Sequence, residues 1–404
     1  MGHVQRKNLK QCIRLFSPAW FAVIMGTGSV SVLAANFHWG AFTTPLKVIS
    51  LAFFLANLAF YTVILAMTIA RYFLFPEVAF TLWSKMLYDP GEGLFVGAFP
   101  IGSANLIDMG VILNQRWHFG GHGFLYTMWA FWWFILGVSY FTAFGMLYVL
   151  SSTRHHMISQ TTAVWVLPII PLIVLSATGG SLAQALIQQS TTLTLLTSAF
   201  SLVSFCVGMS ITLMMLTLYL IRLILRGPPL PHVIMASFIV MSPLGQGGSS
   251  LLVNGEALYR VLPLRAEGTF LLSEFAGQAL YIGCFIGAWV LWSMGLTWII
   301  ISLSSILIVF RTTRIPFSLS CWGLVFPNGV FALCSVRLGV ALDSPFFNYF
   351  GAIWSIFVLL LWIGAFIPTV THLWDTSIFT DHVTTNMLSQ AERDVVDDGQ
   401  AKRV

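Results

Sequence analysis

The sequence contains very few charged residues. Asp, Glu, Lys and Arg make up 8% of the 404 residues, whereas about 25% is usual in soluble proteins. Hydrophobic residues make up 57%, and the mean hydropathy is +0.86. This composition excludes an ordinary soluble domain and indicates an integral membrane protein. The net charge of +5 comes mostly from segment ends, so it reports on membrane orientation and does not indicate nucleic-acid binding.

Residues that ligate metals and cofactors are also scarce. The five cysteines show no paired spacing, which argues against disulfides and against a metal cluster. None of the nine histidines lies deep in an apolar run, and the H-E-x-x-H zinc motif is absent. We therefore expect no metal and no cofactor. A membrane-embedded enzyme or redox protein is disfavoured, because the apolar runs hold no cluster of catalytic groups.

Long apolar runs dominate what is present. A membrane-spanning helix needs roughly 20 apolar residues, and ten runs meet or approach that length: 18–36, 48–69, 94–113, 124–150, 163–186, 193–224, 234–253, 270–310, 317–336 and 347–372. The eighth run is about twice the length that one span requires. It is either one long tilted helix or a short outer helix followed by a span.

The distribution of positive charge favours ten spans. With both termini cytoplasmic, ten spans place 14 Lys and Arg residues inside and 5 outside, whereas dividing the eighth run in two gives 10 and 9. Cytoplasmic loops normally carry the excess. We expect a cytoplasmic tail over 1–14, a transmembrane domain over 15–374 and a cytoplasmic tail over 375–404.

Glycine and proline alternate between successive runs. The odd-numbered runs hold 18 of these residues in 103 positions, whereas the even-numbered runs hold 10 in 148. The odd runs also carry the polar residues Thr27, Ser29, Ser103, Asn105, Ser176, Thr178, Gln184, Ser242, Gln246 and Asn328. Small residues let helices approach closely, and breaks are tolerated where they line a cavity. The sequence therefore predicts an all-α polytopic membrane protein, with five helical hairpins around a central pore and the odd helices in an inner ring.

The ninth run contains the most informative stretch, residues 321–331. Gly323, Pro327 and Gly329 weaken a helix there, and Asn328 adds an amide. Phe326, directly before the proline, could project its ring into a cavity at the break. We interpret the stretch as the narrowest part of a pore gated by Phe326. An ordinary proline kink with a packed phenylalanine remains the alternative.

Other small and polar residues of the odd runs are candidates to line the pore or contact substrate. They are Gly26, Thr27, Gly28, Gly97, Phe99, Asn105, Pro168, Pro171, Gly179, Pro243, Gly245, Gln246, Gly247, Pro327 and Asn328. No Lys or Arg lies in the middle of an odd run. An anion would therefore depend on helix dipoles, free backbone N–H groups and hydroxyls.

Asp108 is the notable acid inside an odd run, three residues after Asn105 on the same helical face. A carboxyl within a membrane span is a candidate functional group, here a proton site. The alternative is an acid near the headgroups that hydrogen-bonds a neighbouring helix end.

Several segments together resemble one family. Residues 16–21 read F-S-P-A-W-F and are followed by M-G-T-G at 25–28; F-V-G-A-F-P-I-G occupies 95–102, and W-G with F-P occupies 322–323 and 326–327. These segments resemble the fungal sulfite efflux pumps of the tellurite-resistance/dicarboxylate transporter family, which also includes plant slow anion channels. Asp89 departs from the His-Pro that usually opens the third span, and this puts a protonation role of that position in doubt.

The resemblance implies ten helices as five hairpins around a pore, with Phe326 as the residue that closes it. It also implies a homo-oligomer, with a trimer suspected. We expect a plasma-membrane transporter that exports the small inorganic anion sulfite or hydrogensulfite through the lipid bilayer. A malate or dicarboxylate transporter, or a gated anion channel of the same fold, is the alternative.

Overall fold

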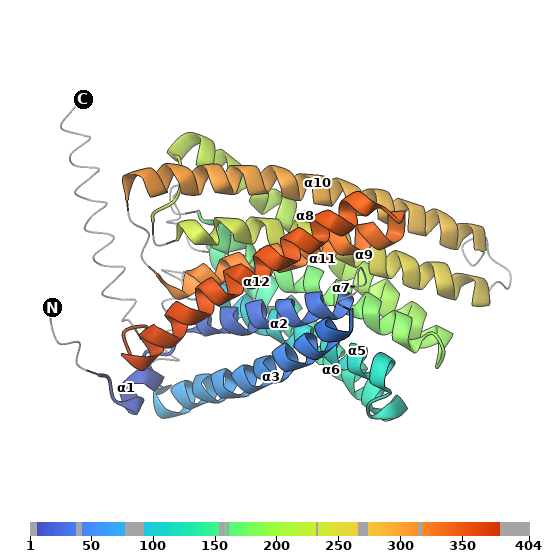
Figure 1. Cartoon of the computed structure of the whole chain (residues 1–404), viewed down its shortest axis with the longest axis horizontal. Helices are drawn as coiled ribbons and strands as arrows, with labels where there is room; N and C mark the ends of the chain where they lie inside the picture. Colours follow the sequence, from blue (N-terminus) through green and yellow to red (C-terminus); the bar gives the residue numbers. More distant parts are fainter. Residues whose placement is uncertain are drawn as a thin grey trace.

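The computed structural model describes residues 6–37, 43–76, 93–152, 158, 161–231, 233–265, 274–313 and 317–379. These residues form helices joined by turns (Figure 1). The described part of the chain starts just before the short helix α1 (Leu9–Arg14) and then alternates between two kinds of helical unit. The predicted all-α class is confirmed.

The even-numbered runs form long uninterrupted helices. They comprise 30 to 39 residues, which at 1.5 Å per residue gives roughly 45–58 Å, well beyond the ~30 Å hydrocarbon core of a bilayer. They are α3 (Thr43–Leu74), α6 (Gly121–Ser152), α8 (Thr191–Arg226), α10 (Glu274–Thr312) and α12 (Pro345–Trp374). The eighth run was predicted to be either one long helix or a short outer helix followed by a span. In the part that the structure describes, from Glu274 onward, it is the single long helix α10.

Each odd-numbered run instead combines a 3-10 segment with a shorter α-helix. The pairs are η1 (Pro18–Trp20) with α2 (Phe21–Asn36), η2 (Gly93–Gly97) with α5 (Ala98–Trp117), η4 (Ala163–Val166) with α7 (Ile170–Leu186), η5 (Ile234–Met241) with α9 (Ser242–Val261), and η7 (Leu319–Leu324) with α11 (Val325–Leu342). A further short segment, η6 (Leu262–Arg265), follows α9.

Contacts between helices follow a simple pattern. Each shorter helix packs against the long helix that follows it: α2 on α3, α5 on α6, α7 on α8, α9 on α10 and α11 on α12. The shorter helices also contact one another in a closed cycle that runs α2, α5, α7, α9, α11 and back to α2. This is the pattern expected of five hairpins with the odd helices innermost.

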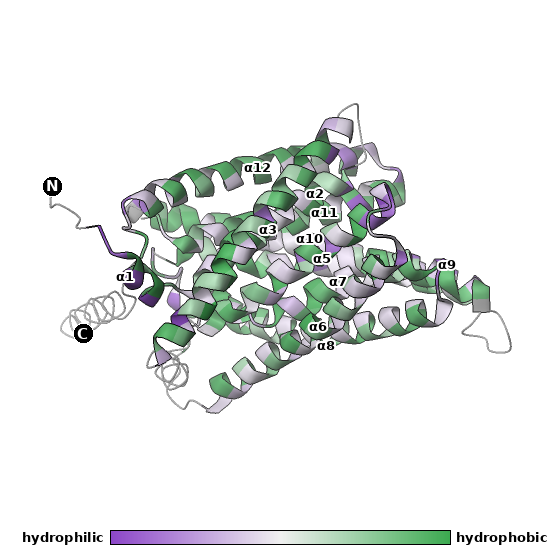
Figure 2. Ribbon diagram, turned by 90° about the horizontal axis from the view of Figure 1, so that it is seen from below, coloured by the Kyte–Doolittle hydropathy of each residue, from purple (hydrophilic) through white to green (hydrophobic). Residues whose placement is uncertain are grey.

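Burial separates the two sets of helices in the same way. In each segment we consider the most apolar stretch of 18 residues. In 18–36, 94% of that stretch is buried, whereas in 345–374 only 17% is buried. The exposed sides of the long helices carry large apolar residues, and Figure 2 shows α12 as mostly hydrophobic along its length. Such surfaces suit contact with lipid chains.

Within the described ranges, eight helical segments are long and apolar enough to cross a membrane, and Ile170–Leu186 is a shorter apolar helix. The α9 helix is less apolar because it carries Gln246, Asn254, Glu256 and Arg260. The molecule is therefore a multi-pass membrane protein, while the count of ten crossings stays a prediction.

The two ends of the described chain meet. The backbone N–H of Lys7 donates to Thr376 Oγ1 at 2.9 Å, and the rings of Trp20 and Phe379 stack at 5.8 Å. The backbone N–H and hydroxyl of Ser377 both donate to Asp375, and these hydrogen bonds hold the pKa of the Asp375 carboxyl below its usual range. Residues 6–7 and 375–379 therefore lie on the same side of the protein.

Candidate functional site

Proline marks the start of most inner α-helices. Pro100, Pro171, Pro243 and Pro327 each fall within the first three residues of α5, α7, α9 and α11, directly after a 3-10 segment or a turn. Proline costs little at this position, because the N–H that it lacks would have no partner within the helix. The N-termini of these four helices, which are the positive ends of their dipoles, therefore lie inside the odd runs and not at the ends of the runs.

Asn328 stabilises the break in the ninth run. Its Nδ2 donates to the carbonyl of Leu324 at 2.7 Å, and its Oδ1 accepts a hydrogen bond from Trp354 Nε1 at 3.2 Å. Trp354 belongs to α12, so the Asn328 amide points toward the outer helix. The predicted polar residue is therefore part of the contact between α11 and α12.

Phe326 is 1% exposed and is among the largest fully buried side chains. It lies four residues before Val330 and seven before Leu333, so all three fall on one face of α11. Val330 and Leu333 line an internal cavity. The Phe326 ring therefore belongs to the cavity-facing side of the helix, about one turn closer to the 3-10 segment.

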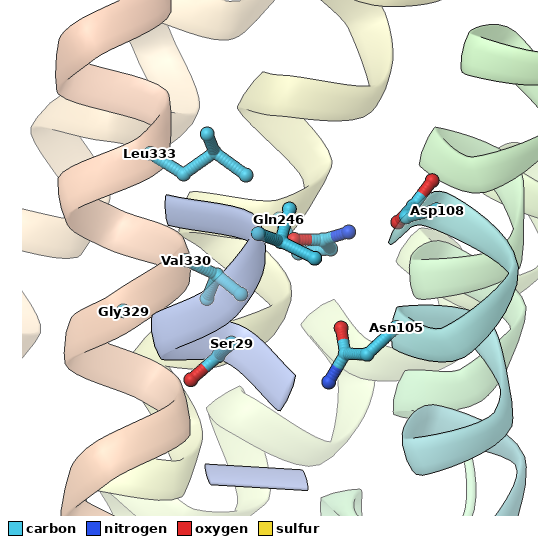
Figure 3. Close-up of a pocket in the computed structure, with 8 residues that line it drawn as sticks. Ser29, Asn105, Asp108, Gln246, Gly329, Val330 and Leu333 are labelled. Atoms are coloured by element: carbon cyan, nitrogen blue, oxygen red, sulfur yellow. The ribbon is translucent and has the colours of Figure 1, made fainter. Parts of the chain in front are cut away.

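A small cavity lies among four of the inner helices (Figure 3). Its volume, measured as the space open to the centre of a water molecule, is about 10 Å³, which is close to the room that one water needs. It is lined by Ser29 and Val32 of α2, Asn105 and Asp108 of α5, Gln246 of α9, and Gly329, Val330 and Leu333 of α11.

Asp108 connects the cavity to α7, the fifth inner helix. Its Oδ2 accepts a hydrogen bond from Thr178 Oγ1 of α7 at 3.1 Å. Its Oδ1 is buried and has no hydrogen-bond partner among the described residues, and the same holds for Oε1 of Gln246. Figure 3 shows the Gln246 amide pointing toward Asp108. Buried polar atoms without partners are costly, and both of these oxygens are acceptors, so the pair is suited to contact a water molecule or another hydrogen-bond donor.

Of the predicted site residues, the structure brings Asn105, Asp108 and Gln246 together at the cavity. Others contact outer helices instead. Thr27 accepts a hydrogen bond from Trp362 of α12 at 3.0 Å. Gly179 packs beside Ser201 and Trp132, and Gly247 beside Met209 and Leu291. The absence of a side chain at these glycines allows close packing between the two layers.

The remaining predicted residues lie between inner elements or at helix starts. A Cβ added to Gly245 would lie 2.8 Å from Cα of Phe331, and one added to Gly26 would lie 2.9 Å from the Trp322 ring. Gly28 and Gly97 are similarly close to Asn105 and to the backbone at Leu167 and Pro168. Phe99 packs against Phe21 and Tyr61. Asp89 lies outside the described residues.

Sequence reasoning missed the cavity residues Ser29, Val32, Val330 and Leu333. The spacing along α11 could have identified Val330 and Leu333. If Phe326 faces the axis, then Val330, Leu333 and Arg337 share its face, because they follow at intervals of four, three and four residues. Arg337 is half-buried, and its Nη1 lies 3.4 Å from the carbonyl oxygen of Ser249 in α9. The cavity-facing stripe of α11 thus ends in a cation.

Comparison with known proteins finds one family model over nearly the whole chain. Residues 15–370 match the model described as SLAC1, voltage-dependent anion channel. A protein named sulfite efflux pump SSU1 from Arthroderma benhamiae is 31% identical over 357 residues, which cover 88% of this chain and 90% of that protein. The protein of the same name from Candida albicans is 24% identical over 91% of this chain and 76% of its own length.

A more distant relative is named for a different substrate. The malic acid transport protein of Schizosaccharomyces pombe is 21% identical over 88% of this chain and 78% of its own length. The family matches cover the whole ring of inner helices, from α2 through α11.

Proposed function

The chain belongs to the SLAC1 family of voltage-dependent anion channels, and from this premise we propose that it exports sulfite or hydrogensulfite through the axis of its inner ring. Transport of a small anion across a membrane follows from the family and from the apolar helices. The choice of sulfite is supported by the relative that is 31% identical and is named a sulfite efflux pump.

The observation that carries the proposal is the ring of five helices that encloses a partly polar cavity beside Phe326. An anion at the axis would meet the positive ends of helix dipoles at the starts of α5, α7, α9 and α11. It would also meet the amide of Gln246, which lines the cavity. Neutral donors of this kind hold an anion without trapping it, as conduction requires.

Phe326 closes the path in this proposal. The cavity admits about one water molecule, and a sulfite ion is larger, so the structure corresponds to a closed conduit. Rotation of the Phe326 side chain away from the axis would connect the cavity to the 3-10 side of the ring. Asp108, whose carboxyl lines the cavity, is the proposed proton site.

Orientation and assembly complete the proposal. We place the protein in the plasma membrane with both termini in the cytoplasm, because that arrangement puts the excess of Lys and Arg inside. The start of each inner α-helix then faces the cytoplasm, where an exported anion enters. A homotrimer is the proposed assembly, on the resemblance to channels of this family.

Flux from proteoliposomes tests the function. Vesicles that contain the purified protein are loaded with labelled sulfite or with labelled malate, and release is compared with protein-free vesicles at two pH values. We expect sulfite release at least about tenfold faster than malate release, a difference of ~1.4 kcal/mol in barrier. Faster malate release would favour the dicarboxylate alternative, to which the Schizosaccharomyces pombe relative points.

A further inference from the structure

Arg337 occupies an unusual position for a cation in a membrane protein. It lies in the last third of α11, on the same face as Val330 and Leu333, which line the cavity. Its side chain is half-buried. Charged side chains at such positions ordinarily pair with an acid or face a polar path.

No carboxylate of the described residues forms an ion pair with Arg337 within 4.0 Å. Its hydrogen bond to the Ser249 carbonyl is long, at 3.4 Å. Asp108 of α5 and Glu256 of α9 are near enough to act on the guanidinium electrostatically. However, Glu256 pairs with Arg260 of its own helix and accepts a hydrogen bond from Gln184.

The neighbouring cavity supplies an independent observation. Asp108 is 8% exposed, and its Oδ1 has no partner in the part of the chain that the structure describes. Gln246 is 4% exposed, and its amide points toward Asp108, between that residue and Leu333 (Figure 3). Arg337 lies one helical turn beyond Leu333. The open Oδ1 of Asp108 and a guanidinium that forms no ion pair with the described residues thus lie within electrostatic reach of each other, near one end of the cavity.

We propose that Arg337 is the anion-binding residue at the exit of the conduit, and that Asp108 is its competing counter-charge. The ligand class is a small oxyanion with two oxygens that can accept the two parallel N–H donors of a guanidinium. The inference rests on the proposed function, because it assigns the outward site of the same transport path. An arginine alone would hold the anion too tightly, and the nearby carboxylate promotes its release.

The two residues therefore act in opposite directions on anion affinity. Replacement of Arg337 by Gln removes the charge and weakens binding, whereas Asp108→Asn removes the competitor and tightens it. A merely structural role would lower stability and activity in both variants, with no opposite change in affinity. Arg337→Lys keeps the charge but loses the planar pair of donors, so it should fall between wild type and Arg337→Gln.

The experiment measures affinity in two ways on the purified full chain. One readout is the sulfite concentration that gives half-maximal efflux from proteoliposomes. The other is the rise in melting temperature that added sulfite causes in detergent, which reports binding without transport. Lys47→Gln is the matched control. Lys47 is exposed at the start of α3 in the outer layer, so this substitution removes the same charge at a position far from the axis.

We expect Arg337→Gln to raise the half-maximal concentration about tenfold or more and to abolish the thermal shift, as for loss of a charge-assisted hydrogen bond. Asp108→Asn should lower that concentration and also lower the maximal rate. Lys47→Gln should stay within about twofold on both readouts. Unchanged values in Arg337→Gln, or weaker binding in Asp108→Asn, would overturn the assignment.

The design separates this inference from the proposed function. If the wild type releases no sulfite but its melting temperature still rises with added sulfite, the export proposal fails. The anion site is then tested by whether Arg337→Gln abolishes that rise. If Arg337→Gln does not fold, Asp108→Asn tests the site instead. Its side chain is nearly the same shape as that of the wild type, and we expect it to bind sulfite more tightly. A wild type with neither flux nor shift overturns both proposals.

Discussion

At the scale of single residues, α11 presents different side chains in different directions. Phe326, Val330, Leu333 and Arg337 follow one face, and two of them line the cavity. Asn328 lies on the opposite face and bonds Trp354 of α12, while Phe331 stacks on Trp292 of α10 at 5.7 Å. One helix thus contributes both to the proposed conduit and to the contact with the outer layer.

Asp108 provides the residue-scale prediction on pH. Asp108→Asn cannot bind and release a proton, so sulfite flux from proteoliposomes should no longer respond to an imposed pH gradient. Asp343→Asn is the control: this exposed acid lies just past α11, in a left-handed conformation that Asn also tolerates. A normal pH response in Asp108→Asn would discard the proton site.

At the scale of elements, the repeated unit is a 3-10 segment followed by an α-helix that packs closely on its neighbours. From Gly and Pro content, the sequence predicted that broken helices alternate with continuous apolar ones, because helix breaks and close contacts both need those residues. The 3-10 form of the breaks was not predicted. Helix limits also agreed well; the first run, 18–36, coincides with η1 and α2.

The orientation of each inner helix could not be predicted in the same way. An inner helix contacts other helices on nearly all sides, so apolar residues surround it and no polar stripe marks the axis. Thr27 and Gly247 therefore read as pore residues, although they contact α12 and the α8–α10 layer. Charge counting likewise ignores the face of the helix on which a residue lies, so it could not show that Arg337 shares a face of α11 with Val330 and Leu333.

Close packing gives a prediction at the element scale. Gly245→Ala would place a Cβ 2.8 Å from Cα of Phe331, so α9 and α11 must separate; overpacking of this kind costs about 1–3 kcal/mol. Gly364→Ala, at an exposed position of α12 with no atom within 4 Å, should be neutral or stabilising. Thermal unfolding in detergent measures both, and equal melting temperatures would contradict the model of the interface.

At the scale of the whole molecule, both described ends lie on one side, where Trp20 stacks on Phe379. Sealed vesicles of known orientation, carrying a protease-sensitive tag at either terminus, test the membrane topology. We expect both tags to be cleaved only from the cytoplasmic side. Cleavage of one tag from each side would exclude an even number of crossings.

Assembly is the second prediction at this scale. The long helices α3, α6, α8, α10 and α12 expose many large apolar residues, which leaves ample surface for lipid or for further copies of the chain. Mass measurement of the protein in lipid nanodiscs should give three chains per particle. A single chain per particle would contradict the trimer.

The central claim is a conduit at the ring axis that Phe326 closes, and sulfite leak from proteoliposomes without an imposed gradient of pH tests it most directly. Phe331→Ala is the matched control, because Phe331 is equally buried in α11 but faces Trp292; size-exclusion profiles confirm that both variants are folded. Phe326→Ala should raise the leak about tenfold or more, while Phe331→Ala stays near wild type. A folded Phe326→Ala variant with wild-type leak would contradict the account.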